Sequence, residues 1–137
     1  MPYKNLSFFQ KEYNKAMAHN KTMTPPPDLP DHGFYYHYKH DPAGPLENYA
    51  YEVIGAGCNT EGDWASPDAY FVIYRPLYES SPAYEAGWLW YLRPATMFME
   101  DVTKPDGMQT PRFHRIVNPE IVSELEERRR ELYHTRT

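Results

Sequence analysis

Cysteine, long apolar runs and basic residues are all scarce in this chain of 137 residues. Cys58 is the only cysteine, which excludes an internal disulfide and a cysteine-based zinc site and favours a reducing, cytoplasmic compartment. Because no apolar run is long enough to cross a bilayer or to form the core of a signal peptide, we expect no membrane association. The net charge of −5 disfavours non-specific binding to duplex nucleic acid.

Aromatic residues, in contrast, are abundant: they make up 16% of the chain and include 13 tyrosines. Tyrosine packs well on a pleated strand while its hydroxyl stays in water. The composition therefore predicts one β-rich domain with terminal extensions. The tyrosines are either half-exposed strand positions over a thin core or part of a ligand-binding face.

Runs of aromatic and β-branched residues, separated by turn signals, predict six short strands over residues 33–39, 49–55, 70–75, 88–93, 98–103 and 111–116. One helical turn is expected directly after Pro94. Gly55 and Gly57 are expected to mark a bulge or sharp bend in the second strand. Short strands joined by turns favour a mainly β fold, a closed or nearly closed antiparallel barrel.

A helix is expected at each end of the barrel. Apolar residues at three- and four-residue steps between Asn5 and His19 predict an amphipathic helix that docks on the barrel or on a second subunit, so that the protein is a monomer or a homodimer. Asn118, Pro119 and Glu120 have the order of an N-cap, a first-turn proline and a first-turn acid. The predicted division is an N-terminal helix over 1–24, a proline-rich spacer over 25–32, the barrel over 33–117 and a C-terminal helix over 118–137. The arginine triplet at 128–130 is expected to be a solvated face that matches the helix dipole.

Two of the predicted strands end in Arg-Pro, at Arg75 and at Arg93. Proline stops strand pairing, so an arginine is left at each strand end. We predict a recognition face made of His37, Lys39, Tyr74, Arg75, Trp90, Arg93 and Arg112. Its rings would stack on a flat group and its guanidinium groups would bind phosphate or carboxylate, which suits a nucleotide, a single-stranded nucleic acid or a peptide. The alternative is that Arg75 and Arg93 pair with carboxylates such as Glu52 and Glu100 and hold the barrel ends together.

Other candidate sites are weaker. His37, His40 and Asp41 have loose spacing for a metal site, and we predict neither a metal nor a cofactor. Cys58 lacks the surroundings of a nucleophile and is expected to be a small buried apolar residue. A carboxylate pair drawn from Glu52, Glu61, Asp63 and Asp68 leaves open a hydrolase acting on a nucleotide-like substrate. A binding module is favoured over that enzyme and over a purely structural or assembly role.

The order of short motifs resembles that of DUF1653, a family of bacterial and phage domains of unknown function. The motifs lie between residues 33 and 116 and are Tyr36-His37-Tyr38-Lys39, Tyr51-Glu52-Val53-Ile54-Gly55, Val72-Ile73-Tyr74-Arg75-Pro76-Leu77-Tyr78, Leu89-Trp90, Leu92-Arg93-Pro94, Met97-Phe98 and Pro111-Arg112-Phe113. The resemblance implies an SH3-like small β-barrel and carries no mechanism. Longer loops after Lys39 and Tyr78, and both terminal helices, depart from the family pattern.

Overall fold

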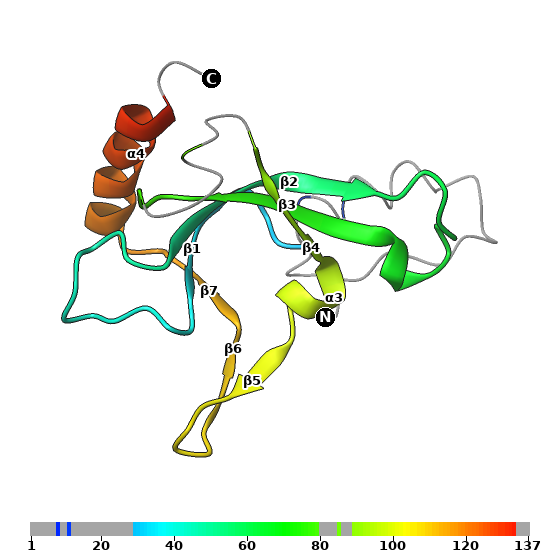
Figure 1. Ribbon diagram of the computed structural model, residues 1–137, viewed down its shortest axis with the longest axis horizontal. Helices are drawn as coiled ribbons and strands as arrows, with labels where there is room; N and C mark the ends of the chain where they lie inside the picture. Colours follow the sequence, from blue (N-terminus) through cyan, green and yellow to red (C-terminus); the bar gives the residue numbers. More distant parts are fainter. Residues whose placement is uncertain (1–7, 9–10, 12–28, 80–84, 86–88, 134–137) are drawn as a thin grey trace.

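A computed structural model describes residues 8, 11, 29–79, 85 and 89–133 of the chain (Figure 1). Its main element is a five-stranded antiparallel sheet with the strand order β4-β3-β2-β1-β7. The strands are β1 (Gly33–His37), β2 (Ala50–Cys58), β3 (Tyr70–Pro76), β4 (Tyr91–Pro94) and β7 (Phe113–Arg115). The fold is therefore mainly β, as predicted.

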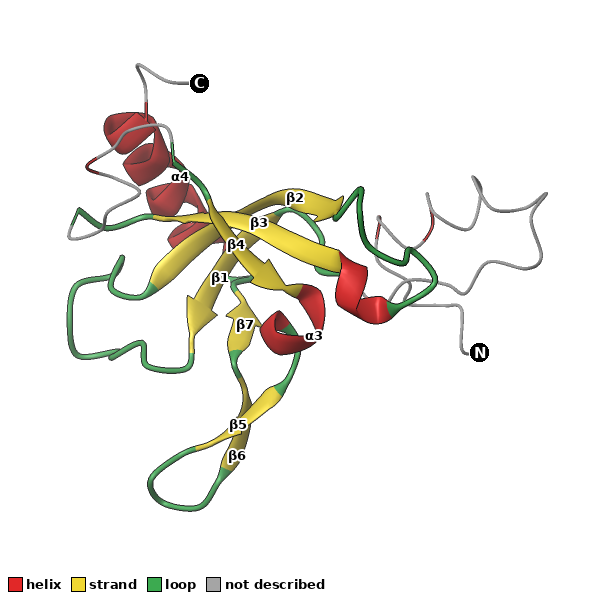
Figure 2. Ribbon diagram, turned by 45° about the vertical axis from the view of Figure 1, so that its right-hand side comes forward, coloured by secondary structure: helices red, strands yellow, loops and turns green. Residues whose placement is uncertain are grey.

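Shorter elements connect these strands. A 3-10 turn, η1 (Pro67–Ala69), precedes β3, and one turn of helix, α3 (Ala95–Phe98), follows β4 where it was predicted. Strands β5 (Asp101–Thr103) and β6 (Gln109–Pro111) form a separate two-stranded hairpin that projects from the sheet (Figure 2). The helix α4 (Pro119–Tyr133) is the last described element.

The two faces of the sheet carry separate clusters of buried side chains, because successive strand residues point to opposite faces. We name them the α3 face and the α4 face after the helix that each contacts. The α3 face holds most of the core, which comprises Leu29, Tyr35, Tyr51, Val53, Ala69, Tyr70, Val72, Tyr74, Ala95, Phe98 and Phe113. The α4 face holds Phe34, Ala50, Leu77, Ile116 and Leu125. Both layers are rich in apolar area, which supplies the main driving force for folding.

The sheet does not close into the predicted barrel. Closure would require β4 to pair with β7, but within the described residues these are the two ends of the strand order. The chain leaves β4 through Pro94 into α3 and then into the β5–β6 hairpin, so α3 lies beside the gap (Figure 2). Phe98 of α3 stacks on Phe113 of β7 with their centroids 4.0 Å apart, and side-chain packing thereby replaces the missing strand pairing.

The helix α4 begins where the sequence signals at Asn118 and Pro119 predict it. The Asn118 side chain accepts a hydrogen bond from the backbone N–H of Glu120 at 2.9 Å, and Pro119 begins α4, which confirms the predicted N-terminal cap. Leu125 is 1% exposed and packs with the α4-face cluster. The arginine triplet is not wholly solvated as predicted, because Arg128 and Arg129 pair with carboxylates of the sheet and its loops.

Several predicted boundaries were wrong in detail. The expected strand 98–103 begins with the end of α3 and forms pairs only from Asp101, because the proline-started helical turn occupies the preceding residues. The expected strand 111–116 divides at Arg112, between β6 and β7. The predicted bulge is found: the β2–β3 register shifts between Val53 and Gly55. Of the predicted N-terminal helix only residues 8 and 11 are described, and most of the proline-rich spacer lies outside the described residues. Among the helices described here, none has the length and apolar character to span a membrane.

Candidate anion-binding site on the α3 face

A group of tyrosines gathers on the α3 face where β2, β3 and β4 lie side by side. Tyr74 makes edge-on contacts with Tyr51 and Tyr91, each with a centroid distance of 5.5 Å. Tyr51 contacts Tyr78 at 5.6 Å, and the hydroxyls of this pair are 2.6 Å apart. Burial raises the pKa of both Tyr51 and Tyr78, so these phenols stay protonated and can donate hydrogen bonds.

Arg93 extends from β4 across the same face. It lies opposite Val72 in the β3–β4 register, and cross-strand partners share a face. Its Nε donates to the Tyr74 hydroxyl at 3.0 Å, Nη1 donates to the sulfur of Met97 at 3.4 Å, and the guanidinium carbon lies 5.8 Å from the centre of the Phe113 ring. Arg93 is thus half-buried and oriented by neutral groups.

No carboxylate neutralises Arg93 in the part of the chain that the structure describes. The same residues contain no buried side-chain nitrogen without a hydrogen-bond partner. The N–H groups of Arg93 that have no protein partner are therefore accessible. An oriented guanidinium with accessible N–H groups and no ion pair is a ready binding group for phosphate or carboxylate.

His37 lies next to this arginine. Its ring packs edge-on against Phe113 at 5.1 Å and stacks on Tyr49 at 5.7 Å. Nδ1 accepts the backbone N–H of Lys39 at 3.2 Å, so the neutral ring carries its proton on Nε2 and is a donor there. Burial, followed by the nearby charges of Arg93, Lys39 and Arg112, lowers the pKa of His37 from 6.5 to about 4. The imidazole is therefore neutral at pH 7.

Two further cations complete the site. Lys39 is exposed, and Arg112 is half-buried with Nε donating to the Met97 carbonyl at 3.2 Å. Arg112 also pairs with Glu100, a carboxylate that the sequence suggested as a partner of Arg75 or Arg93 and not of Arg112. We call His37, Lys39, Tyr74, Arg93 and Arg112 the anion site. Its surplus of positive charge sits on a protein whose net charge is −5.

Arg75 and Trp90 do not belong to the anion site, although the sequence grouped them with it. Arg75 is 6% exposed on the α4 face, where its Nε donates to Glu52 at 3.0 Å. Its guanidinium also lies 4.0 Å from the centre of the Tyr133 ring and 5.3 Å from that of Trp90. The prediction that Arg75 and Arg93 lie on one recognition face was wrong, because they occupy opposite faces of the sheet. The pairing with Glu52, considered as the alternative, is what the structure contains.

The remaining sequence candidates lie elsewhere. Cys58 is exposed at the end of β2, so the prediction of a buried residue was wrong. Glu52 is held between Arg75 and Arg129, and Asp63 accepts the backbone N–H of Ala65 within its own loop. His40 stacks on Tyr36 at 3.6 Å, whereas His37 stacks on Tyr49. Among the described residues, no group of three or more His, Cys, Asp or Glu is arranged to hold a metal ion.

The main residues that sequence reasoning missed are Tyr49, Tyr51, Tyr78 and Phe113, which surround the anion site. Tyrosine is abundant in the sequence, but no local pattern distinguishes a tyrosine of the core from one that lines a binding site. The antiparallel register, which brings β1, β2 and β3 together, supplies that information.

The fold and this site define a mainly β domain with an open antiparallel sheet and a cationic, tyrosine-rich face. A family model described as "Protein of unknown function (DUF1653)" matches residues 33–115. The chain belongs to this family, which confirms the resemblance. No curated protein and no solved structure shows significant similarity to the chain.

Proposed function

We propose that this protein is a binding module whose α3 face holds a ligand with an anionic group and a flat ring. Nucleotides, short single strands of nucleic acid and phosphorylated or acidic aromatic peptides have this chemistry. The guanidinium of Arg93 and the Nε2–H of His37 bind the anion, and the neighbouring tyrosines supply ring faces and hydroxyl donors.

The observation that carries the proposal is that Arg93 is half-buried and is contacted by neutral groups. Desolvating a charge is costly, and burial of a charge therefore usually comes with a partner of opposite charge. Arg93 instead has a phenol, a thioether and an aromatic ring. This arrangement keeps the cation oriented and leaves its charge free to attract an anion.

The hydrolase alternative has less support. Glu52, one of its candidate carboxylates, is 8% exposed and engaged by two arginines on the α4 face. The other three candidates follow β2 in the loop that leads to β3. A purely structural role gives no reason why Arg93 has no carboxylate partner among the residues that the structure describes.

Substitution of Arg93 tests the proposal. Arg93→Gln removes the charge but keeps a polar side chain, and it should weaken binding of AMP, a short single strand or a phosphotyrosine peptide by at least about tenfold in calorimetry. Arg130→Gln is the matched control, because Arg130 is exposed and pairs with Glu127 on α4. The control should stay within about twofold of the wild type.

Salt dependence provides a second measurement on the same samples. Affinity for an anion should fall as salt is raised, and Arg93→Gln should flatten that dependence. Equal binding by wild type and Arg93→Gln at every salt concentration, or no binding of any of these probes, would overturn the proposal.

A further inference from the structure

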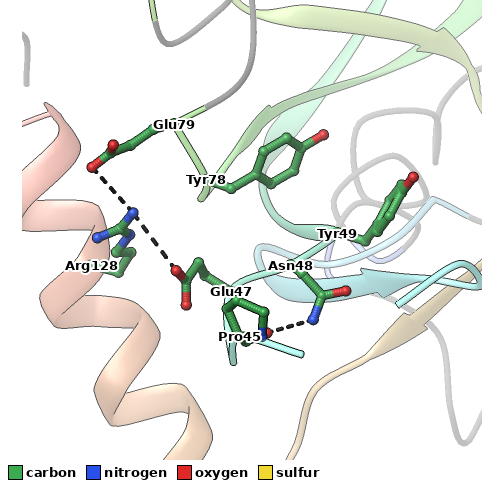
Figure 3. Close-up of a pocket in the computed structure, with 7 residues that line it drawn as sticks. All are labelled: Pro45, Glu47, Asn48, Tyr49, Tyr78, Glu79 and Arg128. Carbon is green, nitrogen blue, oxygen red and sulfur yellow. Dashed lines mark hydrogen bonds and ion pairs between the residues drawn. The ribbon is translucent and has the colours of Figure 1, made fainter. Parts of the chain in front are cut away.

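A cavity of about 520 Å³ includes in its lining Tyr49, the ring that stacks on His37 of the anion site. Its size is within the range of small-molecule sites. It is lined by Pro45, Glu47, Asn48, Tyr49, Tyr78, Glu79 and Arg128. Figure 3 shows the two tyrosines on the side away from α4, while Arg128 extends from α4 toward Glu47 and Glu79.

Tyr49 is held in an unusual conformation at this cavity. Its φ of 54° lies in the left-handed region, which bulky residues seldom adopt. The flanking backbone holds it there: the His37 N–H donates to the Tyr49 carbonyl at 3.0 Å, and the Asn48 side chain is bonded to Asp41 and Pro45. Tyr49 is nevertheless 40% exposed. Non-glycine residues with such strained backbones cluster at active sites and ligand-binding sites.

The same ring joins the cavity to the anion site. Tyr49 stacks on His37 with a centroid distance of 5.7 Å and an interplanar angle of 26°, and it lies 6.3 Å from Tyr78. His37 in turn contacts Phe113, over which Arg93 lies. A continuous series of ring contacts therefore connects Arg93 with Tyr49 and Tyr78.

The charged residues around the cavity restrict which substituents the flat ring of a ligand can bear. Arg128 is within 3.8 Å of Glu47 and 3.4 Å of Glu79, and its other nitrogen is 3.6 Å from Glu131. Carboxylates thus outnumber cations around the cavity. They repel a second phosphate but accept hydrogen bonds from an amino group on a ring edge. A nucleic acid strand that continued through the cavity would meet this negative charge.

We infer that the cavity takes the base of a single nucleotide that bears a ring amino group, such as CMP or AMP, with its one phosphate at the anion site. This inference rests on the proposed function and narrows its ligand from anions with a flat ring to mononucleotides. Tyr49 is the stacking residue of the site.

The test compares CMP, UMP and ribose 5-phosphate by calorimetry with the full chain. Ribose 5-phosphate reports the anion site alone, and UMP carries a carbonyl where CMP carries the amino group. CMP should bind about tenfold more tightly than ribose 5-phosphate and about fivefold more tightly than UMP.

Variants of Tyr49 identify the stacking contribution. Tyr49→Asn tolerates the left-handed backbone but removes the ring, so this variant should bind CMP no more tightly than it binds ribose 5-phosphate. Tyr49→Phe keeps the ring and should keep CMP affinity. A cooperative urea unfolding curve shows that each variant is folded.

Equal affinity for CMP and ribose 5-phosphate would overturn the inference and leave the anion site intact. Tighter binding of a short single strand or a phosphotyrosine peptide than of CMP would overturn the choice of a mononucleotide. Absence of binding by ribose 5-phosphate and by every other probe would instead contradict the proposed function itself.

Discussion

At the residue scale, the neutral state of His37 links the anion site to stability. Its pKa is about 4 in the folded protein and 6.5 ordinarily, so below pH 6.5 the unfolded chain binds the extra proton first. The stability that depends on the neutral ring is present above pH 6.5 and is lost as the pH falls toward 4. Because the ring is only half-buried, we expect a loss of about 1 kcal/mol between pH 7 and pH 5.

Urea unfolding of the wild type and of His37→Gln at both pH values measures this loss. The wild type should lose about 1 kcal/mol more than the variant, which has no imidazole to protonate. Identical losses would mean that His37 titrates normally and is not held neutral by its surroundings.

At the scale of elements, Glu52 connects β2, β3 and α4. It accepts from Arg75 at 3.0 Å and from Arg129 at 2.9 Å, and Arg75 is buried. Glu52→Gln leaves that buried guanidinium without its carboxylate, so we expect a loss of about 2–4 kcal/mol in the free energy of unfolding. Glu127→Gln, in an exposed pair with Arg130, should cost less than about 1 kcal/mol. Similar urea midpoints for the two variants would show that the buried pair does not hold the elements together.

The same elements show what sequence patterns could and could not predict. Local signals were sufficient for α3 after Pro94 and for the start of α4 at Asn118, because caps and prolines act within a few residues. Closure of the sheet could not be predicted, since strand patterns do not specify which strands pair. The predicted position of Arg75 was wrong for the same reason, because only the β2–β3 register places Arg75 opposite Glu52.

The site was partly predictable. Residue chemistry selected His37, Tyr74 and Arg93 as candidates, and the structure places them together on the α3 face. The contribution of Tyr49 depends on a left-handed backbone and on neighbours from β1 and the segment after β3. Those are properties of the folded chain, and no local motif carries them.

At the scale of the whole molecule, charge is segregated. The protein has a net charge of −5, yet Lys39, Arg93 and Arg112 act together on His37, while glutamates line the adjoining cavity. A small ligand with one anionic group suits this distribution better than a long polyanion, which the overall negative charge repels. The proposed binding face is therefore defined by local charge and not by the net charge.

NMR titration of the His37 imidazole, with and without saturating ribose 5-phosphate, tests the anion site most directly. An anion bound beside Arg93 offsets the cations that disfavour protonation, so the pKa of His37 should rise from about 4 by about one pH unit or more. Arg93→Gln should abolish that ligand-induced rise. A His37 pKa that is the same with and without ribose 5-phosphate, at concentrations where binding is saturated, would contradict an anion site on the α3 face.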